Sequence, residues 1–407
     1  MDSMLVIGSS LLLFGIAVGG YAFAGYPLLL GILRIVRRDP APGSRHPSDD
    51  FELPRLSVTV PVFNEAHQLH ELLESLVALD YPPDRLQILL VSDGSTDGSD
   101  ELIGEWSDRG IELLRVDQRG GKGEAENSAR SHLRGNIIVN SDASIRIRPD
   151  GLLRIVEPFA DPRVGVVSGR DVSVAKRDDD ANRGEAGYVG YEMRVRELET
   201  ATGGIVGASG SFYATRRELH DVAIPPKLSR DFASALVARD HGLVAVSQPD
   251  AVCYVPRTRS LRLEYRRKVR TIARGMSTLW AWRHLLNPIR HRQFAWKLWS
   301  HKVSRWMLPF ALILTASGLG ILATREPLAL LGLAAGVVVL VIGASGWAAG
   351  HLRNDLPLHS LISAPAYLLL SNVAVLHALV RSLRGGSERL WEPTRRGTGG
   401  HTVPEDG

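Results

Sequence analysis

The first candidate chemical group is Asp93, which follows the apolar run Gln87–Val91 and begins the sequence Asp-Gly-Ser-Thr-Asp. A carboxylate at this point could accept hydrogen bonds from a base or a ribose in a partly dry pocket. Gly94 would keep the backbone clear of such a ligand. The same residues also suit a tight turn or a helix cap, so the loop alone leaves both interpretations open.

A second candidate group is Asp142, which comes shortly after the apolar run Asn136–Val139 and is followed by Ala143 and Ser144. Its carboxylate could bind Mg²⁺ or Mn²⁺, because both ions prefer oxygen ligands. Such an ion would hold two phosphates and stabilise the charge that develops on a leaving nucleoside diphosphate. A cap for the following turn is the alternative role of this side chain.

A third candidate is the loop Arg119–Gly123, which combines glycines with two cations just before a predicted helix. Backbone N–H groups and a lysine at a helix start bind phosphate oxygens well, so Lys122 is a candidate phosphate ligand. The loop lacks the G-x-x-x-x-G-K-[ST] spacing of a Walker loop, and an ordinary polar loop is the alternative.

An alternation of strand-like and helix-like segments must position these groups. Apolar runs predict strands at residues 56–62, 87–91, 111–116 and 136–139, and helical spacing predicts helices at about 69–77, 98–109 and 124–133. This alternation implies right-handed crossovers and a doubly wound, mostly parallel α/β sheet. Because ligands bind at the carboxyl ends of such strands, we expect Phe63–Glu65 and the loops of Asp93 and Asp142 to share one rim.

These motifs, taken in order, resemble glycosyltransferase family 2, whose members have the GT-A fold. The matching stretches are Val60–Glu65, Val91–Asp97, Gly120–Lys122, Asp142–Ser144 and Pro149–Asp150, and the resemblance extends from about residue 56 to residue 276. It implies a nucleotide-sugar-binding domain that transfers a sugar with inversion and uses Mg²⁺ or Mn²⁺ as cofactor.

The resemblance also implies roles for the donor-side residues. The nucleoside site would be lined by Pro61, Phe63, Glu65 and Asp93, with Lys122 near the same nucleotide. Asp142 matches the first acid of the family's D-x-D motif, which binds the donor diphosphate through the metal. Ser144 stands where the second acid would be and would fill that metal position with a hydroxyl or a water.

On the acceptor side, the resemblance identifies residues 203–211 as a glycine-rich loop. The predicted contacts to acceptor or diphosphate are Gly207, Ser209, Gly210, Arg267 and Arg270. Asp231 matches the last acid of the E-D motif and would be the catalytic base, since an attacking hydroxyl must lose its proton as the new bond forms. Without the resemblance, an N-cap for the helix 232–239 would be the preferred role for Asp231.

The sequence departs from the family pattern at Ser144, at Arg230 and at Thr271. Arg230 replaces the first acid of E-D and would place positive charge beside the proposed base, which would lower its pKa. Thr271 replaces the tryptophan of the Q-x-x-R-W motif, so we expect transfer of single sugars rather than processive synthesis. Ser144 and Arg230 also motivate an alternative, in which the chain is a degenerate family member that serves as a nucleotide- or saccharide-binding membrane scaffold.

Long uncharged runs lie on either side of this region. Residues 4–33 exceed the roughly 20 residues needed to cross a bilayer, and a cleavable signal peptide is the less favoured alternative. Arg34, Arg37 and Arg38 then indicate a cytoplasmic domain at the cell (inner) membrane. Further candidate spans are residues 306–323, 327–350 and 356–383, of which the last is interrupted by His359, Pro365 and Asn372 and has a re-entrant or interfacial segment as its alternative. Three spans would leave the arginines between 381 and 396 outside, against the same bias, so this topology stays open.

The expected organisation has six parts. They are an anchor at 1–38, a linker at 39–54, a GT-A domain at 55–255, a basic amphipathic interfacial segment at 256–305, membrane segments at 306–383 and a polar tail at 384–407. Packing of the basic segment inside the protein is the alternative to an interfacial position.

Composition excludes several classes of function. The single cysteine, Cys253, allows neither an internal disulfide nor a cysteine metal cluster. Basic residues gather beside apolar segments, so a lipid bilayer rather than nucleic acid is the expected partner. A transporter is disfavoured because the spans lack paired charges. The family resemblance implies a UDP-sugar donor, a saccharide or lipid-linked acceptor and, for any exported product, a separate export partner, in cell-envelope or exopolysaccharide synthesis.

Overall fold

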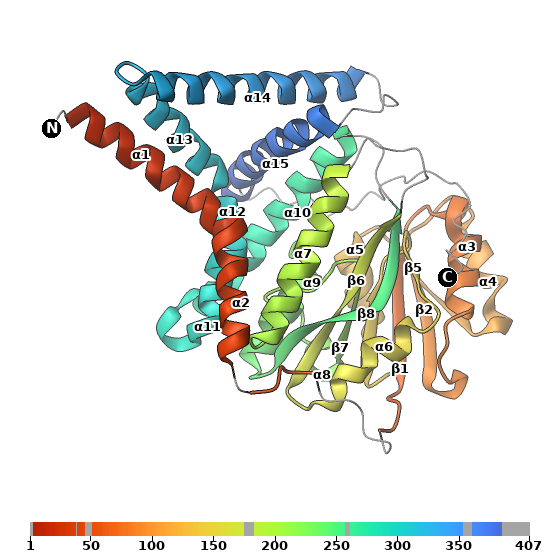
Figure 1. Ribbon diagram of the computed structural model, residues 1–407. Coiled ribbons are helices and arrows are strands. Elements are labelled where there is room, and N and C mark those ends of the chain that lie inside the picture. The colour runs from red at the N-terminus through yellow and green to blue at the C-terminus, as the bar shows by residue number, and fades with distance from the viewer. Residues whose placement is uncertain are drawn as a thin grey trace, which may run out of the picture.

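The computed structural model describes residues 3–37, 39–44, 51–174, 183–256, 261–352 and 360–384. A twisted sheet flanked by helices forms one part of the molecule, and long apolar helices gather at one end of it (Figure 1). The predicted fold class is confirmed: the sheet is mostly parallel in its first half and is covered by helices, and apolar helices lie at both ends of the described chain.

The sheet has eight strands in the order β3-β2-β1-β4-β7-β6-β8-β5. Parallel pairs join β1 to β2 and β4, β2 to β3, and β6 to β8, whereas β7 runs antiparallel to β4 and β6, and β5 to β8. The strand bounds are β1 Leu56–Val62, β2 Leu86–Asp93, β3 Ile111–Val116, β4 Ile137–Ser141, β5 Arg146–Ile147, β6 Val164–Val174, β7 Phe212–Arg216 and β8 Val244–Pro256. Every residue of β1 is buried, as expected for a strand covered on both faces.

The helices of this part are α3 Ala66–Val77, α4 Ser99–Gly104, α5 Lys122–Ala129, α6 Gly151–Val156, α7 Arg183–Ala201, α8 Arg217–His220 and α9 Arg230–Asp240. The helix expected at 98–109 is shorter than predicted and gives way to a 3₁₀ turn at Ser107–Arg109. Gly104 is a weak helix former, and Trp106 turns into the main core beside the sheet.

The remaining helices are α1 Ser3–Gly20, a π-helical turn Tyr21–Gly25 and α2 Tyr26–Val36 at the start of the chain, then α10 Leu261–Ala281, α11 Pro288–Leu298, a second π-helical turn Trp299–Val303, α12 Ser304–Trp306, α13 Leu308–Leu322, α14 Pro327–Leu352 and α15 Ser360–Leu383. Within the described ranges, three stretches are long and apolar enough to cross a membrane: Ser3–Val36, Pro327–Ala349 and Leu361–Leu383. The bent pair Pro288–Trp306 and Leu308–Leu322 would make a fourth if it forms one span. The predicted span at 306–323 corresponds to α13, which has 15 residues and bends by 59° from the helix before it. By itself α13 is shorter than the roughly 20 residues that a crossing needs.

Helix α1 packs closely along α13 because glycines remove side chains from the contact. A Cβ at Gly15 would lie 2.6 Å from the Ala311 carbonyl oxygen, and one at Gly318 would lie 2.6 Å from the Gly8 carbonyl oxygen. Small residues allow helix backbones to approach in lipid, where dispersion contacts replace the hydrophobic effect. The apolar start of the chain is therefore joined to the apolar segments that follow the sheet.

Helix α10 carries its apolar stripe toward another helix of the described chain. Val269 and Ala273 are buried against Ala374 and Ala378 of α15, and the Tyr265 hydroxyl lies 2.9 Å from Nδ1 of His377. This face of α10 is therefore packed inside the protein, which was the alternative to an interfacial position. The interfacial position of the segment 256–305 as a whole stays a prediction.

We expect Gly15→Leu to separate α1 from α13 and to lower the melting temperature of the detergent-purified protein. Overpacking of this kind costs roughly 1–3 kcal/mol. Gly20→Leu is the matched control, because nothing lies within 4 Å of a Cβ at Gly20. Equal melting temperatures for Gly15→Leu and wild type would contradict this packing.

Candidate active site

The loops that follow β1 and β2 are joined at the rim of the sheet. Asn64, in a left-handed conformation with φ 52°, accepts a hydrogen bond from the Thr96 backbone N–H at 2.8 Å. The Asn64 N–H donates to the Ser95 hydroxyl at 3.2 Å, and the Ala66 N–H donates to the Asp97 carboxylate at 3.0 Å. These cross-links hold the two predicted nucleoside loops together.

Asp93 is a buried carboxylate that orders the glycine loop. Its two oxygens accept hydrogen bonds from the backbone N–H groups of Gly120 and Gly121, each at 2.8 Å. A Cβ at Gly94, where φ is 70°, would lie 3.4 Å from the Arg119 nitrogen, so the two loops pass close to one another. Each carboxylate oxygen has a further lone pair for a ligand. Asp93 thus connects the loop after β2 with the glycine loop before α5, two motifs that lie apart in the sequence.

The other predicted nucleoside residues surround this junction. The Arg119 guanidinium lies over the Phe63 ring, 3.8 Å from its centroid. Pro61 is buried in β1 opposite Val91. Glu65 is also buried and accepts a hydrogen bond from the Gln68 side chain. The Phe63 ring and the Arg119 cation form a flat, positively charged surface suited to a base or a phosphate.

Lys122 forms the centre of the candidate site. Its ammonium group donates to Asp142 Oδ1 at 2.5 Å and to the Gly210 carbonyl at 3.3 Å, and it lies 3.8 Å from the Glu126 carboxylate. Burial alone would lower the pKa of Lys122, but Asp142, Glu126 and Asp231 outweigh it and raise the pKa above its usual value. The ammonium group therefore stays charged and holds several acids around it.

Asp142 is the carboxylate that the sequence predicts as a metal ligand. Its backbone N–H donates to the Ser211 carbonyl at 3.1 Å, which joins the end of β4 to the start of β7. Among the described residues there is no group of three or more His, Cys, Asp or Glu side chains that could hold a metal. Mg²⁺ is commonly bound by one or two carboxylates plus substrate phosphates, so this donor set fits an ion that arrives with a diphosphate.

Asp231 lies in the first turn of α9, beside the glycine-rich loop. The Ser229 hydroxyl donates to Asp231 Oδ1 at 2.6 Å. A Cβ at Gly210 would lie 3.2 Å from Asp231 Oδ2. Since Lys122 bonds the Gly210 carbonyl, the structure brings together Asp142, Lys122, Gly210 and Asp231, which the sequence assigned to donor and acceptor sides of one site.

The Arg230 side chain makes its contacts with side chains of α5. Its guanidinium group is buried, lies 3.3 Å from the Glu126 carboxylate and donates to the Asn127 side chain on α5. The positive charge of Arg230, which precedes Asp231 in the sequence, is therefore balanced by the Glu126 carboxylate on α5.

Two arginines of α10, Arg267 and Arg274, have structural partners. Arg267 donates to the buried Glu264 carboxylate at 2.8 Å, and Arg270 lies on the next turn of the same helix. Arg274 donates to the Leu228 carbonyl at 2.5 Å, directly before the segment that carries Asp231. Contact of Arg267 and Arg270 with a ligand stays a prediction.

Sequence reasoning missed Asp171 on β6. The predicted acceptor residue Ser209 donates to Asp171 Oδ2 at 2.6 Å, and the Cys253 thiol donates to Oδ1 at 3.4 Å. Burial raises the pKa of Asp171, and the charge of Asp142 adds to the increase. No motif marks this residue, since a single acid in a strand has no spacing signal.

A buried polar network behind the glycine-rich loop was also missed. The two ring nitrogens of His301 lie 2.8 Å from the Glu199 and Glu192 carboxylates of α7. Glu199 accepts from the Tyr26 hydroxyl of α2 at 2.5 Å and from the Val206 backbone N–H at 3.4 Å. The network therefore connects the apolar helix α2 to the loop that contains Gly207.

Lys302 extends this network toward the site. Its ammonium nitrogen would lie 3.6 Å from a Cβ at Gly207 and is 5.3 Å from the centre of the Phe232 ring, next to Asp231. A cation thus faces the predicted acceptor loop from the segment that precedes α13.

The central part of the chain is similar to proteins of a known family. Residues 57–222 match the family model described as "Glycosyl transferase family 2". A beta-monoglucosyldiacylglycerol synthase of Nostoc is 26% identical over 226 residues, which are 53% of this chain and 47% of the relative. An undecaprenyl-phosphate 4-deoxy-4-formamido-L-arabinose transferase of Edwardsiella ictaluri is 32% identical over 114 residues, 27% of this chain and 35% of the relative. The chain spans about half the length, or less, of these relatives.

A solved structure has a similar fold over most of the chain. It is a mannosyltransferase from Pyrobaculum calidifontis in complex with GDP-Man and Mn²⁺. The TM-score is 0.68 at 24% sequence identity, and the match covers 92% of this chain and 99% of that one. The likeness therefore includes the helices outside the sheet.

We expect Mn²⁺ to bind this protein weakly by itself and much more tightly with a nucleoside diphosphate, because one paired carboxylate cannot complete its coordination. Asp142→Asn should remove the nucleotide-dependent binding, whereas Asp150→Asn, an acid held by Arg148, should not. Isothermal titration with Mn²⁺, with and without UDP or GDP, measures this. Tight binding of Mn²⁺ without nucleotide would show that the assigned donor set is incomplete.

Proposed function

The chain carries a glycosyltransferase family 2 domain with the GT-A fold, and from this premise we propose that it is a membrane-bound, inverting enzyme. The proposed reaction moves a sugar from a nucleotide sugar to a lipid-linked or saccharide acceptor. The observation that carries the proposal is the convergence on Lys122 of Asp142, the proposed diphosphate-side acid, and Asp231, the proposed base.

In the proposed mechanism, an acceptor hydroxyl attacks the anomeric carbon on the side opposite the diphosphate. The new C–O bond forms as the bond to the diphosphate oxygen breaks, and Asp231 takes the hydroxyl proton. Ser229 occupies Oδ1 of Asp231, which leaves Oδ2 beside Gly210 for the acceptor. Lys122 holds positive charge next to the leaving group. A divalent ion bound with the donor at Asp142 would neutralise the charge of the leaving diphosphate.

The donor-side roles are proposals of the same kind. Asp93, Phe63, Pro61 and Glu65 would line the nucleoside pocket, and Ser144 would contribute a hydroxyl near the metal. A UDP-sugar is the donor expected from the sequence, and the structurally similar mannosyltransferase binds GDP-Man. Both nucleotides therefore belong in any test of the donor.

A lipid-linked acceptor is supported by the position of the acceptor loop. The loop containing Gly207 is held from behind by Glu199, which is bonded to Tyr26 of the apolar helix α2. Lys302 faces the same loop from the segment before α13. The names of the relatives from Nostoc and Edwardsiella ictaluri also refer to lipid acceptors. An acceptor hydroxyl held at the bilayer would reach Asp231 from this side.

We further propose that the catalytic domain faces the cytoplasm of the cell membrane. The second half of α15 packs against α10, the helix that follows the catalytic domain, so we place the arginines at the end of α15 on the cytoplasmic side as well. This position agrees with the positive-inside bias, which three C-terminal spans would oppose.

The first functional prediction concerns the base. Asp231→Asn should reduce sugar transfer by roughly 10²–10⁴-fold, because an amide cannot accept the hydroxyl proton. Nucleotide binding should be unchanged. The measurement is release of UDP or GDP by the purified protein in nanodiscs, with a panel of nucleotide sugars, Mn²⁺ and a lipid acceptor.

Asp240→Asn is the matched control for this substitution, because Asp240 ends the same helix and is bonded by His284 rather than by the candidate site. Turnover that survives in Asp231→Asn would remove the assigned base. Nucleotide binding without any turnover in the wild type would favour the scaffold alternative.

The second prediction concerns topology. Cys253 is buried, so a single cysteine introduced as Arg384→Cys can be labelled selectively. It should be protected from an impermeant maleimide in intact cells and react in inverted membrane vesicles. Labelling of this position from the outside of cells would reject a cytoplasmic position for the end of α15.

A further inference from the structure

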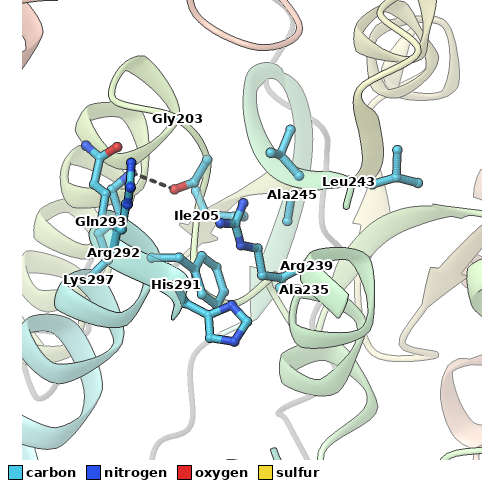
Figure 2. Close-up of a pocket in the computed structure, with 13 residues that line it drawn as sticks. Gly203, Ile205, Ala235, Arg239, Leu243, Ala245, His291, Arg292, Gln293 and Lys297 are labelled. Atoms are coloured by element: carbon cyan, nitrogen blue, oxygen red, sulfur yellow. Dashed lines mark hydrogen bonds between the residues drawn. The ribbon is translucent and has the colours of Figure 1, made fainter. Parts of the chain in front are cut away.

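A pocket lies apart from the candidate active site, where the start of the glycine-rich loop meets α9, β8 and α11. Figure 2 shows side chains from α9 on one side and from α11 on the other facing this opening. Its lining comprises Gly203, Gly204, Ile205, Ala235, Arg239, Leu243, Val244, Ala245, His291, Arg292, Gln293, Phe294 and Lys297. The basic members of this set are Arg239, Arg292, Lys297 and His291, and the set contains no acid.

A further cation reaches the rim of the pocket from the end of α2. A Cβ at Gly203 would lie 2.9 Å from Arg37 Nη1 and 3.5 Å from the Gln293 side-chain oxygen. Burial lowers the pKa of Lys297 to about 7; the charge of Glu199 opposes this decrease, and the charges of Arg37 and Arg239 add to it. Cations from three separate helices thus converge on one small region.

These cations are poorly matched by acids. Lys297 is buried, and its side-chain nitrogen donates to the Gly204 carbonyl oxygen at 2.9 Å (Figure 2). It also donates to the Glu199 carbonyl oxygen at 2.7 Å. Arg239 lies over the Phe294 ring, 5.5 Å from its centroid. Within the described ranges, no carboxylate forms an ion pair with Arg37, Arg239 or Arg292. Repulsion between neighbouring cations costs free energy that a bound anion would offset.

Large apolar side chains next to the pocket have no protein cover. Ile35 and Val36, just before Arg37, are 85% and 70% exposed, and Ile289 on α11 is 85% exposed. Exposed apolar residues beside cations are typical of a surface that lies in the headgroup region of a bilayer. The anion expected at this position is therefore one that a lipid presents.

We propose that this pocket binds the phosphate group of an anionic lipid headgroup. Arg239 and Arg292 contact the phosphate oxygens from the two sides of the opening, Arg37 approaches from the end of α2, and Ile35 and Ile289 lie among the acyl chains. Arginine suits this role because its planar guanidinium group can bind two phosphate oxygens at once.

A lipid bound in this pocket would act on the start of the glycine-rich loop. Gly203 and Gly204, with φ values of 115° and 113°, begin the loop that continues to Gly207 and Gly210. The Lys297 side-chain nitrogen donates a hydrogen bond to the Gly204 carbonyl. A headgroup at this site would hold the start of the predicted acceptor loop at the membrane surface.

Binding can be tested without donor or acceptor, so its outcome does not depend on the proposed transfer reaction. The full chain in detergent is mixed with vesicles of phosphatidylcholine, with or without phosphatidylglycerol, and flotation measures the bound fraction. We expect phosphatidylglycerol to increase binding of the wild type. The paired substitution Arg239→Gln and Arg292→Gln should weaken this binding by roughly fivefold for each arginine removed.

Arg290→Gln is the matched control, since Arg290 lies on the same helix but outside the pocket lining. It should bind vesicles nearly as the wild type does. Circular dichroism and gel filtration of the paired variant show whether it is folded, and Arg239→Lys provides a milder substitution if it is not.

Three results would overturn the proposal. The first is equal binding of the wild type to both kinds of vesicle. The second is a loss in Arg290→Gln as large as that in the paired variant, which would indicate diffuse surface charge instead of a pocket. The third is that inorganic phosphate raises the melting temperature of the wild type through Arg239 and Arg292 while phosphatidylglycerol has no effect, which would assign the site to free phosphate.

Discussion

The arrangement of the candidate site depends on one partly buried cation. The Lys122 ammonium group at the start of α5 is balanced by Asp142 at the end of β4, by Glu126 one turn further along α5 and, at longer range, by Asp231 on α9. Glu126 in turn pairs with Arg230. A buried charge without partners is costly, so β4, α5 and α9 are held in one relative position by this chain of charges.

This constraint explains why two departures from the family pattern are compatible with an organised site. Arg230 belongs to the ion network on α5, where it compensates Glu126, and its neighbour Asp231 is oriented by Ser229 instead. Ser144 leaves Asp142 as the principal acid at the end of β4. A metal held there would depend on diphosphate oxygens, which suits an ion that enters and leaves with the nucleotide.

A second polar network connects the catalytic domain to the apolar helices. Glu199 on α7 is bonded by Tyr26 of α2 and by His301 of the segment before α13, and it also accepts from the backbone of the glycine-rich loop. Polar groups in an apolar setting bond in few alternative ways, so the loop is placed relative to the membrane-facing helices with little freedom. The proposed headgroup pocket begins at the other end of the same loop.

The sequence by itself predicted the first four strands, the helices that follow the first three of them, the apolar segments and the acids at the strand ends, because periodicity and spacing are local properties of a chain. It did not predict β5, β6, β7 or β8. It marked Lys122, after two glycines, as a candidate phosphate ligand. Only the tertiary structure decided that it lies between Asp142 and Asp231, that Asp171 supports Ser209, and that Tyr26 bonds Glu199. These contacts join residues far apart along the chain, and packing alone decides which of many polar side chains meet.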